Sequence, residues 1–372
     1  MGIVALPPSW EELPPDLLGL VLHRLPSLDD RVRLRAVCRP WRAGAHPQRH
    51  KPLPPPLPWF ALRDGALVDL QGAQVRCGPI LRKGVSRYLA VGDLAFLVHD
   101  DGAGSLMYPL SGFTLPLPQL APAVRRALDE SKAYRRSNIV KTHCKAILSS
   151  PLDSTTEPFI AVLMMEGHGL AASACKQPYA ISAGVPDPES TRRIYDIASF
   201  TGSSMSSPIM KAFMPWSLML DDLASQNRHQ VECSGKLLMI RRWMSYPGEA
   251  RLGDHDRTFR FEVFEADLAT IPGRWINVDS LDGHAIFLDS ECSKSVLASK
   301  CAGGVQEDCI YFMHRIFDHP TREYFGPCVD PFRDSGVYSM RDAKITPLLP
   351  EAVMVELRCK QQYLTWFFPT GA

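Results

Sequence analysis

Two short stretches near the start of the chain alternate apolar and polar residues with a helical period. Apolar residues recur at i, i+3, i+4 and i+7 in both: Leu18, Val21, Leu22 and Leu25 in the first, and Leu34, Val37, Cys38 and Trp41 in the second. This spacing predicts two amphipathic helices, with Asp16 and Asp29 placed to cap them. Pro26 ends the first helix, and Pro40 predicts that the chain restarts there as a third short helix.

From Trp59 onward the hydrophobic period changes to about two, which is typical of strands. The run 258–264 alternates cleanly, so that Phe259, Phe261 and Val263 are expected on one face. The best candidate for a helix in this part is 121–136. The alternation predicts strands over 88–91, 95–99, 105–108, 139–148, 159–165, 230–233, 236–242, 258–264, 275–278, 285–288, 309–313, 336–340 and 364–368.

Many short strands separated by Gly and Asp turns indicate a sandwich, a barrel or a propeller. About 310 residues are too many for one sandwich but suit about six or seven blades of some 45–50 residues. One part of the pattern is typical of kelch-like blades, in which a Trp lies between neighbouring sheets. It consists of the strand over 258–264, the acidic bend after it and a strand led by Trp275. The predicted fold class is therefore α+β by content and mainly β: a small three-helix module followed by a propeller, with some irregularity among its blades.

A proline-rich segment, 46–58 (HPQRHKPLPPPLP), separates the two kinds of pattern. Consecutive prolines favour an extended, semi-rigid spacer. We therefore predict a helical module over 8–46, a linker over 47–58 and a propeller over 59–370. A stiff arm of this kind would hold the two domains at a set distance.

The helical stretch from Trp10 to Arg42 resembles an F-box, the three-helix module that binds the Skp-type adaptor of a cullin–RING ubiquitin ligase. A helical hairpin packed on the following domain is the alternative, and the order and spacing of the motifs favour the F-box. About 33 residues cannot bury this many apolar side chains by themselves, so part of the surface must dock on something. The motifs that carry the resemblance are Leu13-Pro14, Asp16-Leu17-Leu18, Leu25-Pro26, Val37-Cys38-Arg39 and Trp41-Arg42.

This resemblance implies an adaptor-binding surface with Trp41 as its first-choice anchor. The residues that it assigns to the surface are Leu13, Pro14, Leu18, Leu22, Leu25, Val37 and Trp41.

A second resemblance covers residues 57–370, which look like the plant propeller found behind an F-box in the KIB-type family. The chain departs from that family at Tyr108, where Asn is usual, and in 165–209, where we expect a degraded blade or a loop. The matching segments are Pro58 to Leu62, Tyr108 to Gly112 with Leu115-Pro116, Ser149 to Pro151, Val231 to Trp243, Trp275 to Asp289, Asp308 to Phe312 and Gly336 to Pro350.

The overall charge is balanced, with 41 Lys and Arg against 40 Asp and Glu, so no nucleic acid or anionic membrane is indicated as a partner. The ten cysteines include no CxxC pair, and no N-x-S/T acceptor or signal segment is present. The longest apolar run, 159–165, is far shorter than the ~20 residues of a membrane helix. These features lead us to expect reduced cysteines and a location in the cytoplasm, the nucleus or both.

Motifs for enzyme chemistry are not found: there is no Gly-rich phosphate loop, HExxH or GxSxG. His143 and Cys144 are adjacent in a predicted strand and so point to opposite faces. We expect no catalytic residue, cofactor or metal site. The nearest metal-ligand candidates fit no zinc spacing: Cys309, His314, His319 and Cys328.

The leading functional hypothesis is a substrate receptor that binds the adaptor through its helices and a target protein, still unidentified, through its propeller. Such a receptor makes and breaks no bonds, and it acts by proximity. A non-degradative or decayed member of the family, which binds without a ligase role, is the second hypothesis. A propeller enzyme is the third, and it would need convergent carboxylates or a metal at the central channel.

Overall fold

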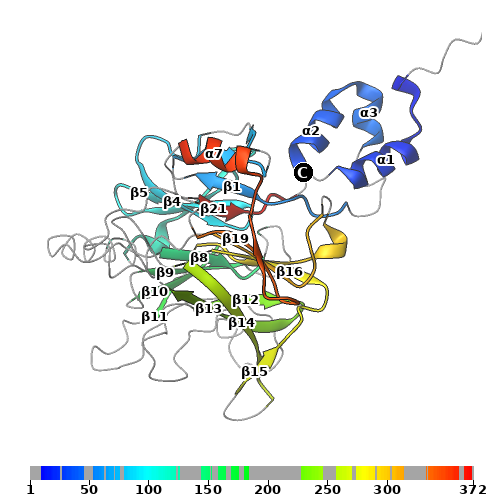
Figure 1. The fold of residues 1–372 in the computed structure, drawn as a ribbon. Helices are drawn as coiled ribbons and strands as arrows, with labels where there is room; N and C mark the ends of the chain where they lie inside the picture. The colour runs from blue at the N-terminus through cyan, green and yellow to red at the C-terminus, as the bar shows by residue number, and fades with distance from the viewer. Residues whose placement is uncertain are drawn as a thin grey trace, which may run out of the picture.

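The structure is a computed structural model in which a small helical module stands beside a larger domain of stacked β-sheets (Figure 1). It describes residues 10–25, 27–45, 53–62, 64–70, 72–75, 79–122, 125, 144–150, 152, 158–164, 169–175, 180–183, 228–245, 257–269, 274–289, 291–301, 304–313, 332, 334–359 and 364–370.

Four helical elements make up the module: η1 (Trp10–Glu12), α1 (Pro15–Arg24), α2 (Leu28–Ala36) and α3 (Arg39–Gly44). The predicted third helix is confirmed, with Pro40 in the first turn of α3. Asp16 and Asp29 are not the caps that were predicted. Each helix begins one residue before its aspartate, so each carboxylate lies inside the first turn. A carboxylate in that position still interacts favourably with the helix dipole.

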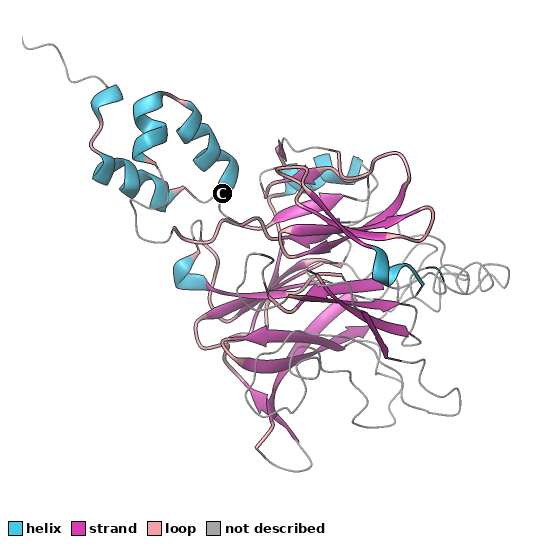
Figure 2. Ribbon diagram, turned by 180° about the vertical axis from the view of Figure 1, so that it is seen from behind, coloured by secondary structure: helices cyan, strands magenta, loops and turns pink. Residues whose placement is uncertain are grey.

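Five sheets contain all strands of the described residues. Figure 2 shows the strands to one side of the helical module and below it. Sheet 1 has the order β21-β1-β2-β3, formed by β1 (Trp59–Leu62), β2 (Leu67–Val68), β3 (Gln74–Val75) and β21 (Leu364–Phe367). Sheet 2 contains β4 (Val85–Val91), β5 (Leu94–His99), β6 (Gly104–Met107) and β7 (Thr114–Leu117) in chain order. Sheet 3 contains β8 (Cys144–Leu148), β9 (Phe159–Met164), β10 (Gly169–Ala174) and β11 (Ala180–Ala183).

Sheet 4 is formed by β12 (Arg228–Cys233), β13 (Lys236–Ser245), β14 (Arg257–Asp267) and β15 (Arg274–Val278). Sheet 5 has the order β17-β16-β18-β19-β20, formed by β16 (His284–Leu288), β17 (Lys294–Leu297), β18 (Cys309–Phe312), β19 (Gly336–Ser339) and β20 (Ile345–Thr346). Its β16 and β18 are parallel, whereas the other paired strands of the described residues are antiparallel. The helical elements of this domain are η3 (Pro118–Leu120), η5 (Ala298–Lys300) and α7 (Glu351–Cys359).

Shared apolar clusters give the order in which the sheets pack. One cluster joins sheets 2 and 3, and another joins sheets 4 and 5. The largest joins sheet 1 to both sheet 2 and sheet 5. The packing order is therefore 3-2-1-5-4, which is the succession of blades around a propeller.

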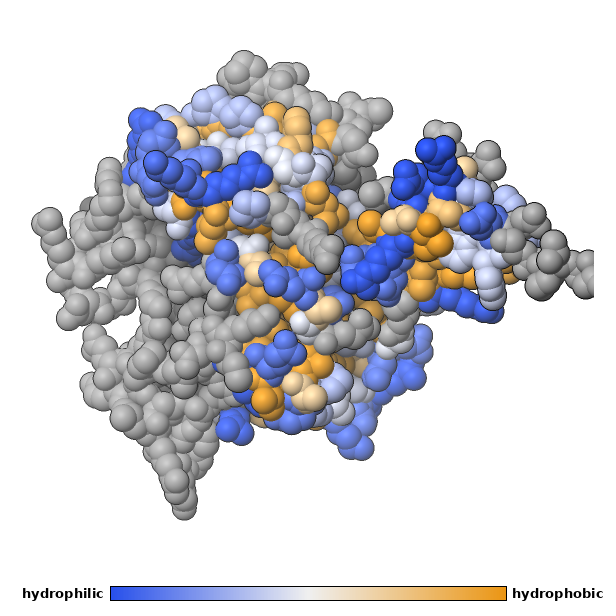
Figure 3. Space-filling view, turned by 90° about the horizontal axis from the view of Figure 1, so that it is seen from above, coloured by the Kyte–Doolittle hydropathy of each residue, from blue (hydrophilic) through white to orange (hydrophobic). Residues whose placement is uncertain are grey.

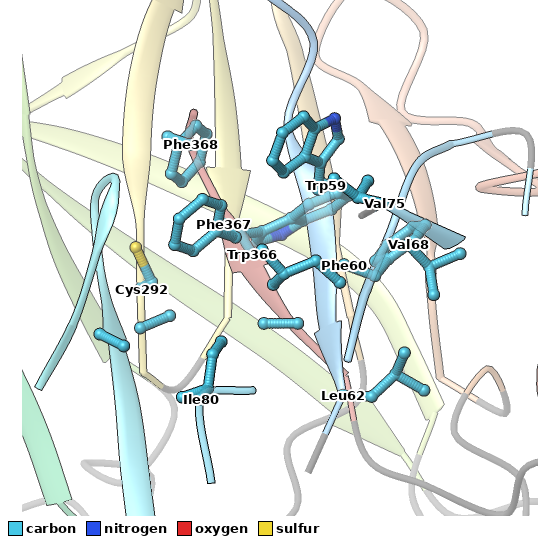
Figure 4. Packing of buried hydrophobic residues seen from close by; sticks show 14 of the residues in the cluster. Trp59, Phe60, Leu62, Val68, Val75, Ile80, Cys292, Trp366, Phe367 and Phe368 are labelled. Carbon is cyan, nitrogen blue, oxygen red and sulfur yellow. The ribbon is translucent and has the colours of Figure 1, made fainter. Parts of the chain in front are cut away.

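Sheet 1 closes this arrangement by pairing the last strand, β21, with the first, β1. Trp59 stacks on Phe367 with ring centroids 6.0 Å apart, and Phe60 stacks on Trp366 at 5.1 Å. Figure 4 shows these rings together in the core of the domain. Because the two ends of the domain share one sheet, the aromatic core of that sheet also holds the ring of blades together.

The predicted blade number was wrong for the part of the chain that is described, which contains five sheets rather than six or seven. The predicted number came from dividing the length of the domain by the average length of a blade, which assumes that each blade is a simple four-stranded meander. Sheet 5 instead spans residues 284–346 and contains five strands, and sheet 1 takes strands from both ends of the domain.

The strand predictions are confirmed in position, since each overlaps a strand of the structure, but one face assignment was wrong. Phe261 and Val263 share a buried face, whereas Phe259, which was predicted on the same face, is 51% exposed. The pairing of β13 with β14 passes from Trp243↔Arg260 directly to Met244↔Thr258, which leaves Phe259 as the extra residue of a β-bulge. A bulge reverses the alternation, and Thr258 therefore points into the core.

Trp275 also differs from the prediction. It packs with Ala266 and Leu268 around Leu237 of its own sheet, whereas a position between neighbouring sheets was predicted. Most of the predicted helix over 121–136 lies outside the described residues, as do His143, His314, His319, Cys328 and most of 165–209. The described part of 165–209 forms β10 and β11 of sheet 3, so a loop was the wrong expectation for those residues.

Candidate docking surface of the helical module

The helical module has a small core of its own. Leu18 and Leu22 of α1 and Leu34 of α2 meet there with Ala45. Gly44 permits the close approach of α3 to α1, because a Cβ at this position would lie 3.0 Å from Leu18 Cδ2. Half-buried side chains pack around this core from Leu13, Leu25, Trp41 and Leu53.

The seven predicted adaptor-binding residues divide into three groups in the structure. Leu18 and Leu22 are 1% and 0% exposed, so they support the module from inside and do not face solvent. Pro14 and Val37 are exposed, and Val37 exposes 63% of its surface. The remaining three are half-buried: Leu13, Leu25 and Trp41.

Trp41, the predicted anchor, is tied into its own chain. Its indole Nε1 donates a hydrogen bond to the backbone oxygen of Trp10 at 2.7 Å, and its backbone N–H donates to Cys38 Sγ at 3.4 Å. Its ring packs against the module core. Replacing Trp41 would therefore disturb the module itself as well as any partner contact.

The apolar stripe predicted for the second helix was wrong. α2 ends at Ala36, and its buried residues are Leu28, Arg31 and Leu34. Val37 caps the end of α2 with helical dihedrals but is 63% exposed, and the backbone becomes extended at Cys38 before α3 begins. The predicted stripe is therefore divided between two helices.

The module carries a second apolar surface that points outward. Of the twelve large hydrophobic side chains that are exposed in the described part of the chain, six lie between residues 10 and 37. Three of them, Leu17, Leu20 and Val21, fall at i, i+3 and i+4 on α1. We call the six residues the docking surface: Trp10, Leu17, Leu20, Val21, Val32 and Val37.

Sequence reasoning missed most of this surface although its signal was present. In α1 the residues at 17, 20 and 21 form one apolar stripe, and those at 18, 22 and 25 form another about 100° away. Periodicity detects both stripes, but it does not distinguish the one that packs inward.

The charged side chains of α2 differ in burial. Arg33 forms ion pairs with Asp29 at 2.6 Å and Asp30 at 3.4 Å, all on the exposed side of α2. Arg31, in contrast, is buried, and this burial, followed by the repulsion from Arg35, lowers its pKa. Hydrophobic and hydrophilic patches alternate on the module in the view from above (Figure 3).

Buried polar groups of the β-domain connect sheets. Each oxygen of Asp289 accepts one pair of hydrogen bonds: Oδ1 from the backbone N–H groups of Glu291 and Cys292, and Oδ2 from Thr365 Oγ1 and the Trp366 N–H. Burial raises the pKa of Asp289 although these donors oppose the shift. The carboxylate thus joins sheet 5 to the closing strand β21.

A second carboxylate, Asp308, joins the turn before β16 to the start of β18. It accepts hydrogen bonds from the Leu281 N–H at 2.7 Å and from Ser280 Oγ at 3.0 Å. Burial alone would raise the pKa of Asp308, but these bonds and the contact with Arg341 outweigh it and hold the pKa below its ordinary value. Both carboxylates are engaged in structure rather than placed for chemistry.

The described residues contain neither a cluster of metal ligands nor a membrane-spanning helix. No group of three or more His, Cys, Asp or Glu side chains there could hold a metal ion. No helix in that part is both long and apolar enough to cross a bilayer.

Comparison with known proteins agrees with this architecture. The model of the KIB1-4 beta-propeller family matches residues 72–339, and the model of the F-box-like family matches residues 10–48. The chain belongs to the KIB1-4 beta-propeller family. Both resemblances seen in the sequence are therefore confirmed, and the helical module of this F-box propeller protein is its F-box-like domain.

One relative of the F-box propeller protein is F-box protein At2g26160 of Arabidopsis thaliana. It is 47% identical over 38 residues, which is 10% of this chain and 12% of the relative. The similarity thus spans about an eighth of that relative's length.

Proposed function

We propose that this protein is a non-catalytic substrate receptor of a cullin–RING ubiquitin ligase. Its F-box-like domain binds a Skp-type adaptor, and its propeller holds a target protein. The observation that carries the proposal is the docking surface, where half of the exposed large hydrophobic residues of the described chain gather on one small module. Monomeric domains rarely leave so much apolar surface in solvent unless a partner covers it.

The two stripes of α1 give the binding a simple physical basis. The inner stripe, with Leu18 and Leu22, builds the module, and the outer stripe, with Leu17 and Leu20, remains available. An adaptor that buries the outer stripe removes apolar surface from water at a gain of roughly 25 cal/mol per Å². The receptor then raises the concentration of a target lysine near the ubiquitin-carrying enzyme. The same proposal locates the protein in the cytoplasm or nucleus.

The test is adaptor binding by a variant of the outer stripe. Leu17→Glu combined with Leu20→Glu places two charges in the predicted interface without entering the module core. We expect the affinity for a purified Skp-type adaptor to fall at least roughly tenfold, since a buried unpaired charge costs several kcal/mol. Isothermal titration calorimetry measures the affinity, and circular dichroism checks that the helices remain.

Val355→Glu is the matched control, because Val355 of α7 is 49% exposed, as is Leu17, but lies outside the F-box-like domain. It should bind the adaptor as the wild type does. Normal binding by the folded double variant would refute the proposed interface. A wild-type protein that binds the adaptor but enriches no ubiquitylated partner from a proteasome-inhibited extract would overturn the receptor function.

A further inference from the structure

One face of α2 connects three parts of the protein. Its buried residues Leu28, Arg31 and Leu34 lie at i, i+3 and i+6. Leu34 belongs to the module core, whereas Leu28, only 3% exposed, belongs to the large apolar cluster of the propeller that includes Trp59. Arg31 lies between the two and contacts the linker, so a single helical stripe reaches the module, the linker and the ring.

Arg31 connects the linker to the end of α1 with two hydrogen bonds, one to each. Its Nε donates to the backbone oxygen of Leu25 at 2.9 Å, at the end of α1, and its Nη1 donates to the backbone oxygen of Pro54 at 2.7 Å. The neighbouring Leu53 packs against the module core from the linker side. The module therefore holds the proline-rich segment through the backbone oxygen of Pro54 and the side chain of Leu53, a few residues before β1 begins at Trp59.

This arrangement is unusual for an arginine. Arg31 is 3% exposed, and the hydrogen bonds that the described residues give it go to carbonyl oxygens rather than to a carboxylate. A buried cation without a counter-charge costs more than an apolar residue of similar size. An arginine buried at this energetic cost indicates that the position of the linker relative to the end of α1 matters to the protein.

We propose that Arg31 is a positioning residue that fixes the orientation of the propeller relative to the docking surface. Thirteen residues, 46–58, separate the last residue of the module from β1. Their prolines make the segment a semi-rigid spacer, but a spacer by itself leaves the angle between the two domains open. Arg31 holds the spacer at Pro54, and Leu28 packs into the propeller cluster, so the two residues together keep the ring in one orientation. The purpose of this rigidity rests on the proposed receptor function, since a target must stay within reach of the ubiquitin-carrying enzyme.

The experiment measures the distribution of distances between spin labels on the full chain, free and bound to the adaptor. Labels attached through unnatural amino acids at Ala43 and Lys83 occupy exposed sites in the module and the propeller. Arg31→Met keeps much of the apolar stem and removes both donors. We expect it to roughly double the width of the distribution while adaptor affinity stays within about twofold. The control Arg33→Met alters an exposed arginine on the same helix and should leave the width unchanged.

A folded Arg31→Met protein with the narrow distribution of the wild type overturns the proposal. If circular dichroism shows that Arg31→Met loses helix, Leu53→Ala takes its place, because it loosens the linker without altering α2. A narrow distribution in Leu53→Ala then overturns the proposal equally. Failure of the wild type to bind an adaptor counts against the receptor function alone, since the distance measurement on the free chain still tests Arg31.

Discussion

Replacing Arg242 by Met should be among the most destabilising single changes in the propeller. Arg242 and Asp334 form an ion pair between sheets 4 and 5, with Nη2 2.6 Å from Oδ2 and side-chain exposures of 0% and 3%. Arg242 Nε also donates to Thr258 Oγ1 at 2.6 Å, and Nη1 donates to the Met313 oxygen at 3.1 Å. The residue thus joins β13, β14 and the segments that flank β18 and β19.

The magnitude follows from what remains after the change. Arg242→Met leaves the Asp334 carboxylate buried, with the Thr258 N–H and hydroxyl as donors but without its counter-charge. Removing one partner of a buried ion pair costs about 3–5 kcal/mol. The guanidinium group also lies 5.0 Å from the ring of Phe312, so that cation–π contact is lost as well. We expect the free energy of unfolding of the propeller to fall by about 3–5 kcal/mol.

Urea unfolding followed by tryptophan fluorescence measures the change. Arg260→Met is the matched control, since Arg260 pairs with Glu262 on the exposed side of β14 and should cost only about 0–1 kcal/mol. Combining Arg242→Met with Asp334→Leu removes both charges, and it should recover part of the loss. A cost below about 1 kcal/mol for Arg242→Met, or a double variant as unstable as the sum of its singles, would refute the reasoning.

Two further predictions concern the buried carboxylates. The folded protein holds the pKa of Asp308 below its ordinary value, so the ionised carboxylate stabilises the fold when the pH is above the ordinary pKa. This stabilisation is lost as the pH falls through the lower pKa of the folded state. Asp308→Asn should therefore be less stable than the wild type at neutral pH, and thermal unfolding should show the difference shrinking below about pH 4. A difference that stays constant with pH would contradict this. Asp289→Asn turns an acceptor into a donor beside the Thr365 hydroxyl and the Trp366 N–H, so hydrogen exchange measured by mass spectrometry should accelerate in residues 364–370; unchanged exchange there would show that the carboxylate does not hold the closing strand.

Much of this protein could be predicted from local sequence because its signals are local. The break at Pro40 and the motifs from Leu13 to Arg42 identified an F-box-like module, and period-two alternation located the longer strands. The two-residue strands β2, β3 and β20 were missed, since two residues are too few for a period to show. The predictions also missed one helix, α7, and the strands β1, β7, β10, β11 and β17, which have four to six residues. The longer strands and the order of family motifs were sufficient to indicate a propeller.

The closure of the propeller depends on partners that are far apart in the sequence. The pairing of β1 with β21 joins residues about 300 positions apart, and Arg242 meets Asp334 across 92 positions. Arg242 follows Leu238 and Ile240 at every second position, and this alternation predicts that its side chain points inward. The alternation does not identify Asp334, the carboxylate that compensates the buried charge of Arg242. Such pairings are selected by the folded chain as a whole.

Most helical and extended segments, and the family of the chain, follow from local sequence, because hydrophobic period and motif spacing depend on neighbouring residues. Which stripe of α1 faces outward depends instead on contacts made in the folded chain, since Leu17 and Leu18 are equally apolar and differ only in what packs against them. The tertiary structure likewise placed Phe259 in solvent through a bulge and turned Arg31 toward the linker. Burial is a property of contacts between distant segments, and no local pattern contains those contacts.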